Sequence, residues 1–233
     1  MRRILSETRR RRWSPALLLL LPLLLAACGG GPSREAVQLA GELRRTPPGP
    51  ATDAMADRMF DCSEVDRACV TLWLYRGAAC ARLAEAPETA EGARPLRRTC
   101  AVEAFTRARA LLPRDATPQE RQEVAIRLAD VHERRRDRAT GDARVAENAA
   151  ILAAVAPLRG TPAAPYADHY EAGVALNRVQ AGEVLPPARC AVLREASRQA
   201  AGTPGGPGLP PLGDRLDQRR AAIAAQLAQE GCT

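Results

Sequence analysis

Apolar and polar residues follow one another with the period of an α-helix along most of the chain after residue 32. Prolines and glycines gather between the periodic segments, where they mark the ends of helices. The alternation of apolar and polar residues that is typical of a half-buried strand is absent from the sequence. The pattern predicts an all-α fold, with helices over residues 33–45, 52–60, 63–85, 96–112, 118–138, 143–156, 165–180, 188–201 and 214–229.

The start of one helix can be read directly from the residues that follow Ala116. Thr117 is a good N-cap, and Pro118 is tolerated at the first helical position, where its missing N–H would have no partner. Glu120 can reach back to the cap and complete a capping box. The buried face behind this start is predicted to hold Val124, Leu128 and Val131.

The next segment is predicted to form a second helix that packs back against the first. We expect Asp142 to cap it and Pro157 to end it. Its expected buried stripe consists of Val145, Ala149, Leu152 and Ala156.

Short motifs recur at nearly constant spacing along the chain. Residues 113–118 and 157–162 both read P-x3-T-P and lie 44 residues apart, and residues 160–162 recur as 202–204 at an offset of 42. Spacing of this kind is typical of stacked supersecondary units. We therefore expect an array of antiparallel helical hairpins, with an ordinary helical bundle as the alternative.

One hairpin places aromatic and small residues at regular gaps. Trp73 and Gly77 lie four residues apart in its first helix, and its second helix carries Ala101, Phe105, Ala108 and Pro113. This pattern resembles the tetratricopeptide repeat. The resemblance implies two closely packed helices, with the phenylalanine filling the space between them. The sequence departs from the family's pattern at Arg76, at Cys80 and in the long loop over residues 86–95.

The N-terminus differs in composition from the rest of the chain. Residues 1–14 are basic, residues 16–27 form an apolar run of 12 residues, and Cys28 follows. This order is typical of a secretory signal peptide. A membrane-spanning helix needs about 20 apolar residues, so this run is too short to cross a bilayer. A short N-terminal anchor or a buried core helix is the alternative.

The apolar run ends in an aliphatic residue, two small residues and a cysteine, which are Leu25, Ala26, Ala27 and Cys28. This ending resembles the lipobox of bacterial lipoproteins. The resemblance implies that a signal peptidase recognises residues 25–27 and that Cys28 carries a diacylglyceryl group and often an N-terminal acyl chain such as palmitate. These chains would hold the protein on the lipid bilayer. Because Gly29 is not the aspartate of an inner-membrane retention signal, we expect the outer membrane in a bacterium with two membranes, on the side facing the periplasm.

These features divide the chain into three parts. Residues 1–27 form the signal peptide, residues 28–50 hold the lipidated cysteine, a flexible glycine tether and a short helix, and residues 51–233 form the helical-hairpin domain. Residues 1–27 carry +5 of the net charge of +7, which leaves about +2 for the remainder. Basicity therefore belongs to the export signal, and no nucleic-acid partner is predicted.

The cysteines after Cys28 are even in number, which indicates disulfides in an exported protein. Cys80 and Cys100 should face each other across one hairpin, and Cys190 and Cys232 should join the start of one helix to the end of the returning one. Cys62 and Cys69 then remain. Seven residues of helix rise by about 10.5 Å, more than a disulfide spans, so either Cys62 lies in the turn before the helix or the pairing differs.

The sequence offers few groups for catalysis or metal binding. Its cysteines and histidines lack the spacing of zinc or haem sites, so no metal or cofactor is predicted and no catalytic residue is assigned. His132 is interpreted as a partly exposed structural residue. Asp168 is not expected to orient His169, because adjacent residues of a helix point in different directions. The run from Glu133 to Arg136 is interpreted as a solvated helix end.

Two functions are compatible with these features. The favoured one is a membrane-anchored scaffold that binds an envelope protein on its helical-repeat surface, without enzymatic activity. The alternative is a cell-envelope enzyme, acting for instance on the cell wall, with a carboxylate site that the sequence does not identify. A cleft with paired acids of raised pKa would favour the enzyme, and a long groove without such a pair would favour the scaffold.

Overall fold

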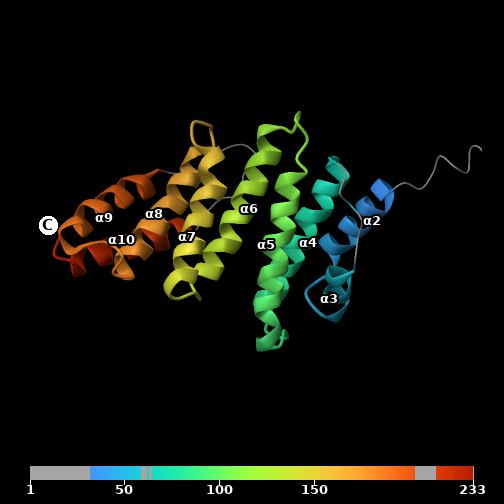
Figure 1. The fold of residues 1–233 in the computed structure, drawn as a ribbon, viewed down its shortest axis with the longest axis horizontal. Helices are drawn as coiled ribbons and strands as arrows, with labels where there is room; N and C mark the ends of the chain where they lie inside the picture. Colours follow the sequence, from blue (N-terminus) through green and yellow to red (C-terminus); the bar gives the residue numbers. More distant parts are fainter. Residues whose placement is uncertain (1–31, 59–61, 63–64, 203–213, 233) are drawn as a thin grey trace, which may run out of the picture.

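The computed structural model describes residues 32–58, 62, 65–202 and 214–232 (Figure 1). These residues form nine α-helices and no strand. The helices are α2 (Pro32–Arg45), α3 (Pro50–Asp57), α4 (Arg67–Glu85), α5 (Arg94–Ala110), α6 (Pro118–Arg136), α7 (Gly141–Val155), α8 (Ala164–Gln180), α9 (Pro186–Ala201) and α10 (Asp214–Gln229). The predicted lipid-attachment site Cys28 and the recognition residues Leu25, Ala26 and Ala27 lie outside the described residues.

Consecutive helices pair into hairpins, and the hairpins stack along the molecule. The closest pairs are α4 with α5, α6 with α7, and α8 with α9. At one end, α2 and α3 pack on α4; at the other, α10 packs on α9 and α8. The predicted all-α class and hairpin array are thus confirmed for the described residues. Among the helices described, none is both long and apolar enough to cross a bilayer.

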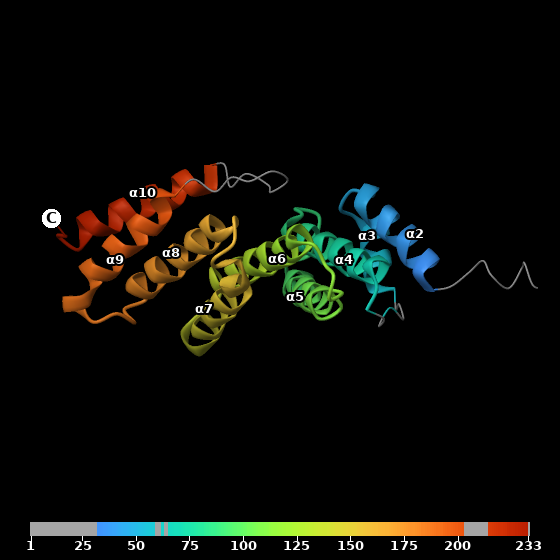
Figure 2. The same cartoon turned by 90° about the horizontal axis from the view of Figure 1, so that it is seen from above.

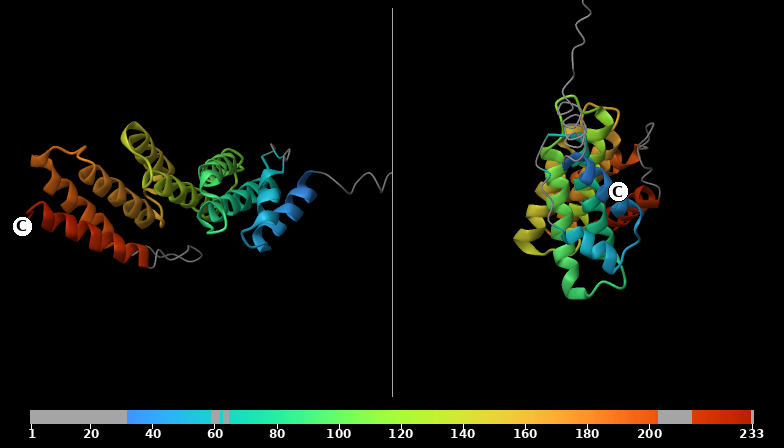
Figure 3. Two further views of the ribbon diagram at one scale, coloured as in Figure 1. Left: turned by 90° about the horizontal axis from the view of Figure 1, so that it is seen from below. Right: turned by 90° about the vertical axis from the view of Figure 1, so that its right-hand side faces the viewer.

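The array is bent about its middle. Seen from above, α5 and α7 lie along one side, α3 and α10 lie along the other, and α6 stands between them (Figure 2). The view from below shows the same bend, and the end-on view shows how narrow the stack is (Figure 3). Helix α6 is therefore the central element, with neighbours on both sides.

Most helix ends lie within two residues of their predicted positions, and the exceptions surround one loop. Helix α3 ends at Asp57 instead of residue 60, and α4 begins at Arg67 instead of residue 63. Asp66 sets the later start, because its Oδ1 accepts a hydrogen bond of 3.2 Å from the backbone N–H of Ala68. Cys62 consequently lies in the turn before α4.

Three disulfides join the cysteines: the two pairs that hairpin geometry predicted, and the remaining pair, whose first cysteine lies before α4. Their Cα–Cα distances are 5.4–5.9 Å, within the usual range for a disulfide. The bonds are Cys62–Cys69, Cys80–Cys100 and Cys190–Cys232.

Helices α4 and α5 pack closely because a glycine faces an aromatic ring. A Cβ placed at Gly77 would lie 2.6 Å from the ring of Phe105, which is itself buried. Trp73 anchors the same helix to the preceding turn by donating a hydrogen bond of 2.8 Å from Nε1 to the carbonyl of Cys62. This is the packing that the tetratricopeptide resemblance implied for the hairpin.

Helix α6 begins as predicted. The side chain of Thr117 accepts from the backbone N–H of Glu120, and the Glu120 carboxylate accepts from the backbone N–H of Thr117 at 2.6 Å, which completes the capping box. The predicted face of Val124, Leu128 and Val131 is buried.

Helix α7 differs from its prediction in both cap and face. It begins at Gly141, so Asp142 lies in its first turn and not at the cap position. Val145 is exposed, as are Ala149 and Ala156, while Leu152 is only partly buried. The buried face instead holds Glu147, Asn148, Ile151, Ala154 and Val155, since polar partners on α6 and α8 allow Glu147 and Asn148 to turn inward.

Candidate functional site

Two pockets flank helix α6. The C-terminal pocket, between α6, α8 and α10, has a volume of about 380 Å³, and the N-terminal pocket, between α4, α5 and α6, has about 470 Å³. Arg134 lines both of them. The two pockets therefore adjoin on the surface of one helix.

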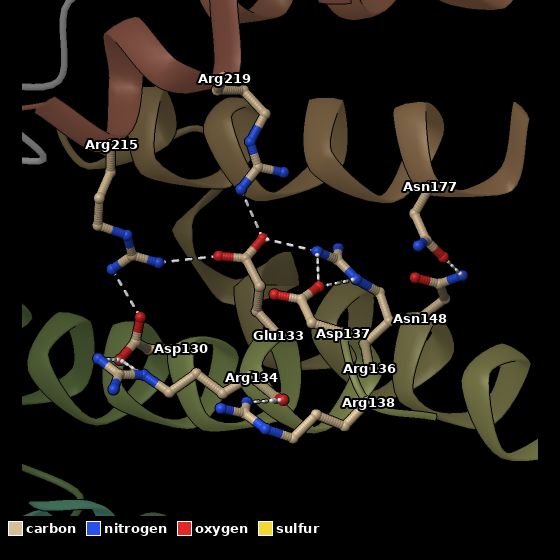
Figure 4. Close-up of polar contacts among 10 residues, drawn as sticks. All are labelled: Asp130, Glu133, Arg134, Arg136, Asp137, Arg138, Asn148, Asn177, Arg215 and Arg219. Carbon is tan, nitrogen blue, oxygen red and sulfur yellow. Dashed lines mark hydrogen bonds and ion pairs between the residues drawn. The ribbon is translucent and has the colours of Figure 1, made fainter. Parts of the chain in front are cut away.

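A buried carboxylate lies at the wall of the C-terminal pocket. The Glu133 side chain is 6% exposed and is surrounded by three guanidinium groups (Figure 4). Its Oε1 accepts from Arg219 at 2.6 Å and from Arg136 at 3.3 Å, and its Oε2 accepts from Arg215 at 2.8 Å. We call these four residues the Glu133 network.

Two further acids extend the Glu133 network on α6. Arg215 also pairs with Asp130, with 2.6 Å between Nη1 and Oδ1. Arg136 donates to Asp137, with 2.7 Å between Nη2 and Oδ1. Because Arg215 comes from α10, these contacts tie the C-terminal helix to the central helix across the pocket (Figure 4).

The charges determine the protonation state of Glu133. Burial alone would raise the pKa of its carboxyl group, but Arg219, Arg136 and Arg215 outweigh burial and lower the pKa to about 2. Glu133 is therefore ionised at neutral pH. A carboxyl group in this state cannot serve as a general acid, which needs a raised pKa.

A glycine on α8 gives Arg219 its path to Glu133. A Cβ at Gly173 would lie 1.5 Å from Nη1 of Arg219, so any side chain at this position would displace the guanidinium. Glycine is otherwise unfavourable in the middle of a helix, and here it leaves room for the guanidinium of Arg219. The residue also lines the C-terminal pocket.

His169 lies on α8, one turn before Gly173. Its side chain is fully buried, and neither ring nitrogen has a hydrogen-bond partner. Burial, with a smaller contribution from Arg219, lowers the pKa of His169 to about 4. The histidine is thus neutral at neutral pH, and Asp168 does not orient it, as expected.

His132 contacts a carboxylate on the neighbouring helix α7. Its Nδ1 lies 2.6 Å from Oε2 of Glu147 on α7, and Arg135 pairs with the other oxygen of Glu147 at 2.9 Å. The His132 side chain is mostly buried. The contact joins α6 to α7 and supports the structural interpretation of this histidine.

The interpretation of residues 133–136 as a solvated end is wrong for Glu133 and Arg136, since both side chains are only 6% exposed. Their side chains are buried because α6 is the central helix and has two buried faces, the predicted one and a second one. Ala125 and Ala129 are buried there, and Glu133 and Arg136 continue this face at spacings of four and three. That spacing is the signal in the sequence that could have identified the site.

The N-terminal pocket has a less polar floor than the C-terminal pocket. Ala78, Ala81, Phe105 and Val131 supply apolar surface. Charged residues stand around that surface, and they are Arg82, Glu85, Arg127, Asp130 and Arg134. The pocket thus combines apolar contact with charges of both signs.

The described residues do not bring together the ligands of a metal centre. No cluster of three or more His, Cys, Asp or Glu side chains in this part of the chain could hold a metal ion. The pKa values of the Asp57, Glu120 and Glu133 carboxyl groups are all lowered. The arrangement is suited to binding through charge and hydrogen bonds.

Comparison with protein families, with curated proteins and with solved structures finds no match for this chain.

Proposed function

We propose that this protein is a lipoprotein of the bacterial cell envelope that holds a partner protein on the surface around helix α6. Acyl chains on Cys28 would anchor it, on the periplasmic side of the outer membrane. The partner would lay an extended segment across the C-terminal and N-terminal pockets. The observation that carries the proposal is that the two pockets adjoin on α6 and share Arg134.

Three features support binding as the function. Stacked helical hairpins commonly bind partner segments on the inner side of their bend. The pockets mix apolar floor with charged rim, which is the composition of non-obligate interfaces. The shifted carboxyl groups are all stabilised in their ionised form, which suits recognition better than acid catalysis.

Crosslinking in intact cells tests the proposal. Ala81→Trp would fill the N-terminal pocket, and Ala149→Trp would place the same side chain on the exposed face of α7, away from both pockets. We expect the wild type and Ala149→Trp to crosslink reproducibly to the same envelope protein, and Ala81→Trp to lose that product while keeping its helical circular dichroism. Equal crosslinking by both variants would place the interface elsewhere and overturn the proposal.

A further inference from the structure

Arg136, which lines the C-terminal pocket, carries a buried hydrogen-bond donor without an acceptor. Arg136 uses Nε and Nη2 for Asp137 and Glu133, but its Nη1 is buried and has no partner. Burying a charged donor without an acceptor is costly, and such groups are uncommon in folded proteins. The side chain is 6% exposed and lines the pocket, so an acceptor placed in the pocket is the natural complement.

The surrounding acids are already engaged. Both oxygens of Glu133 accept from arginines, and Asp137 accepts twice from Arg136. Asp130 is shared between Arg134 and Arg215. The four arginines that line the pocket therefore face three carboxylates, one fewer than full neutralisation requires.

Neutral amides also line the pocket. Asn177, Gln180 and Gln218 face the pocket, and Asn177 uses its Oδ1 to accept from Asn148 at 3.0 Å. That bond leaves the Nδ2 of Asn177 as a donor. The pocket thus offers a cationic donor and amide donors to one small anionic group.

We propose that the C-terminal pocket binds the carboxylate of an aspartate or glutamate side chain in the partner's extended segment, with Nη1 of Arg136 as its donor. The proposal rests on the proposed function and adds the chemistry of the partner. A single negative charge matches the missing acceptor. A doubly charged phosphate would place excess negative charge beside Glu133 and Asp137, which is unfavourable at short range.

Side-chain NMR of the full chain in detergent micelles tests this assignment. The Nε–Hε signal of Arg136 would be identified with Arg136→Gln and followed during titration with the peptide Ac-Ala-Ala-Glu-Ala-Ala-NH2. The matched peptide with Gln in place of Glu removes only the charge, and inorganic phosphate supplies the other anion. We expect the Glu peptide alone to shift the Arg136 signal. A shift with phosphate alone, an equal shift with both peptides, or no shift with either would overturn the carboxylate assignment.

Two variants of α10 locate the binding without altering charge. Ala222 lines the C-terminal pocket, whereas Ala225 is exposed on the same helix and does not. We expect Ala222→Phe to weaken binding of the Glu peptide by about tenfold or more, the size expected from losing a hydrogen bond to a charged group. Ala225→Phe should leave binding unchanged, and equal weakening by both would exclude this pocket.

The outcomes separate this inference from the proposed function. If the Glu peptide fails to bind while Ala81→Trp still abolishes crosslinking, only the carboxylate assignment is wrong. If crosslinking does not depend on the pockets but the Glu peptide still shifts Arg136, the scaffold surface is wrong and the anion site remains.

Discussion

Arg219 crosses helix α8 at Gly173, where no side chain obstructs it. In Gly173→Ala the new Cβ would move the guanidinium of Arg219 away from Glu133. Glu133 would then keep only Arg136 and Arg215 as ion-pair partners. We expect the free energy of unfolding to fall by about 1–3 kcal/mol, the usual effect of weakening a buried charged pair. Urea denaturation of wild type and variant measures the loss.

A matched glycine and a double mutant control this result. A Cβ at Gly92 would meet no atom within 4 Å, so Gly92→Ala should not destabilise the protein. In the Arg219→Ala background the space beside Gly173 is empty, and Gly173→Ala should then cost much less. Purely additive losses would show that the two residues do not interact.

His169 should make stability depend on pH. Its pKa is about 4 in the folded protein and near its ordinary value of 6.5 when unfolded, so between these values only the unfolded chain binds the proton. Stability should therefore fall as pH drops from about 6.5 and level off below about 4, by up to about 3 kcal/mol. His169→Leu removes the titration and two unpartnered nitrogens. The variant should unfold at a higher urea concentration than wild type, and the difference between their urea midpoints should widen toward pH 4. A difference that does not change with pH would contradict the lowered pKa of His169.

The helices themselves were largely predictable because their ends depend on local chemistry. Thr117, Pro118 and Glu120 define the start of α6 within four residues of sequence. The face of α7 was not predictable in this way. Its inward residues Glu147 and Asn148 are polar. They are buried only because they form hydrogen bonds with His132 and Asn177 on other helices.

Reduction should loosen the hairpins unequally, because the disulfides close chain segments of different length. Cys190–Cys232 spans 42 residues and Cys80–Cys100 spans 20, for which loop entropy gives about 4 and about 3 kcal/mol. In a stacked array each hairpin contacts only its neighbours, so the effect should stay local. Replacing Cys190 and Cys232 by alanine should speed hydrogen exchange in α9 and α10, with little change in α4. Uniform acceleration along the chain would argue against a stacked array.

At the level of the assembled array, the C-terminal pocket could not be read from the sequence because its residues are far apart in the chain. Arg215 and Arg219 reach Glu133 from 82 and 86 residues away. Their positions four residues apart on α10 place them on one helical face. The neighbouring residues in the sequence, however, do not identify Glu133 as their partner. Only the stacking of hairpins brings α10 over α8 to the central helix, and this creates both the charge network and the cavity beside it.

The predicted attachment of the whole array to a membrane depends on one sulfur atom, that of Cys28, and can be tested by replacing it. Cys28 lies four residues before the start of α2, a stretch that reaches at most about 14 Å when extended, so lipidation would hold the α2 end of the array close to the bilayer. Cys28→Ser removes the thiol that would receive the diacylglyceryl group, whereas Gly29→Ser changes the neighbouring residue and keeps that thiol. We expect wild type and Gly29→Ser to enter the detergent phase of a phase-separation extract, with acyl mass on the N-terminal peptide. Cys28→Ser should remain an uncleaved precursor or enter the aqueous phase without acyl mass. Wild-type protein in the aqueous phase with an unmodified N-terminal peptide would show that the lipoprotein assignment is wrong.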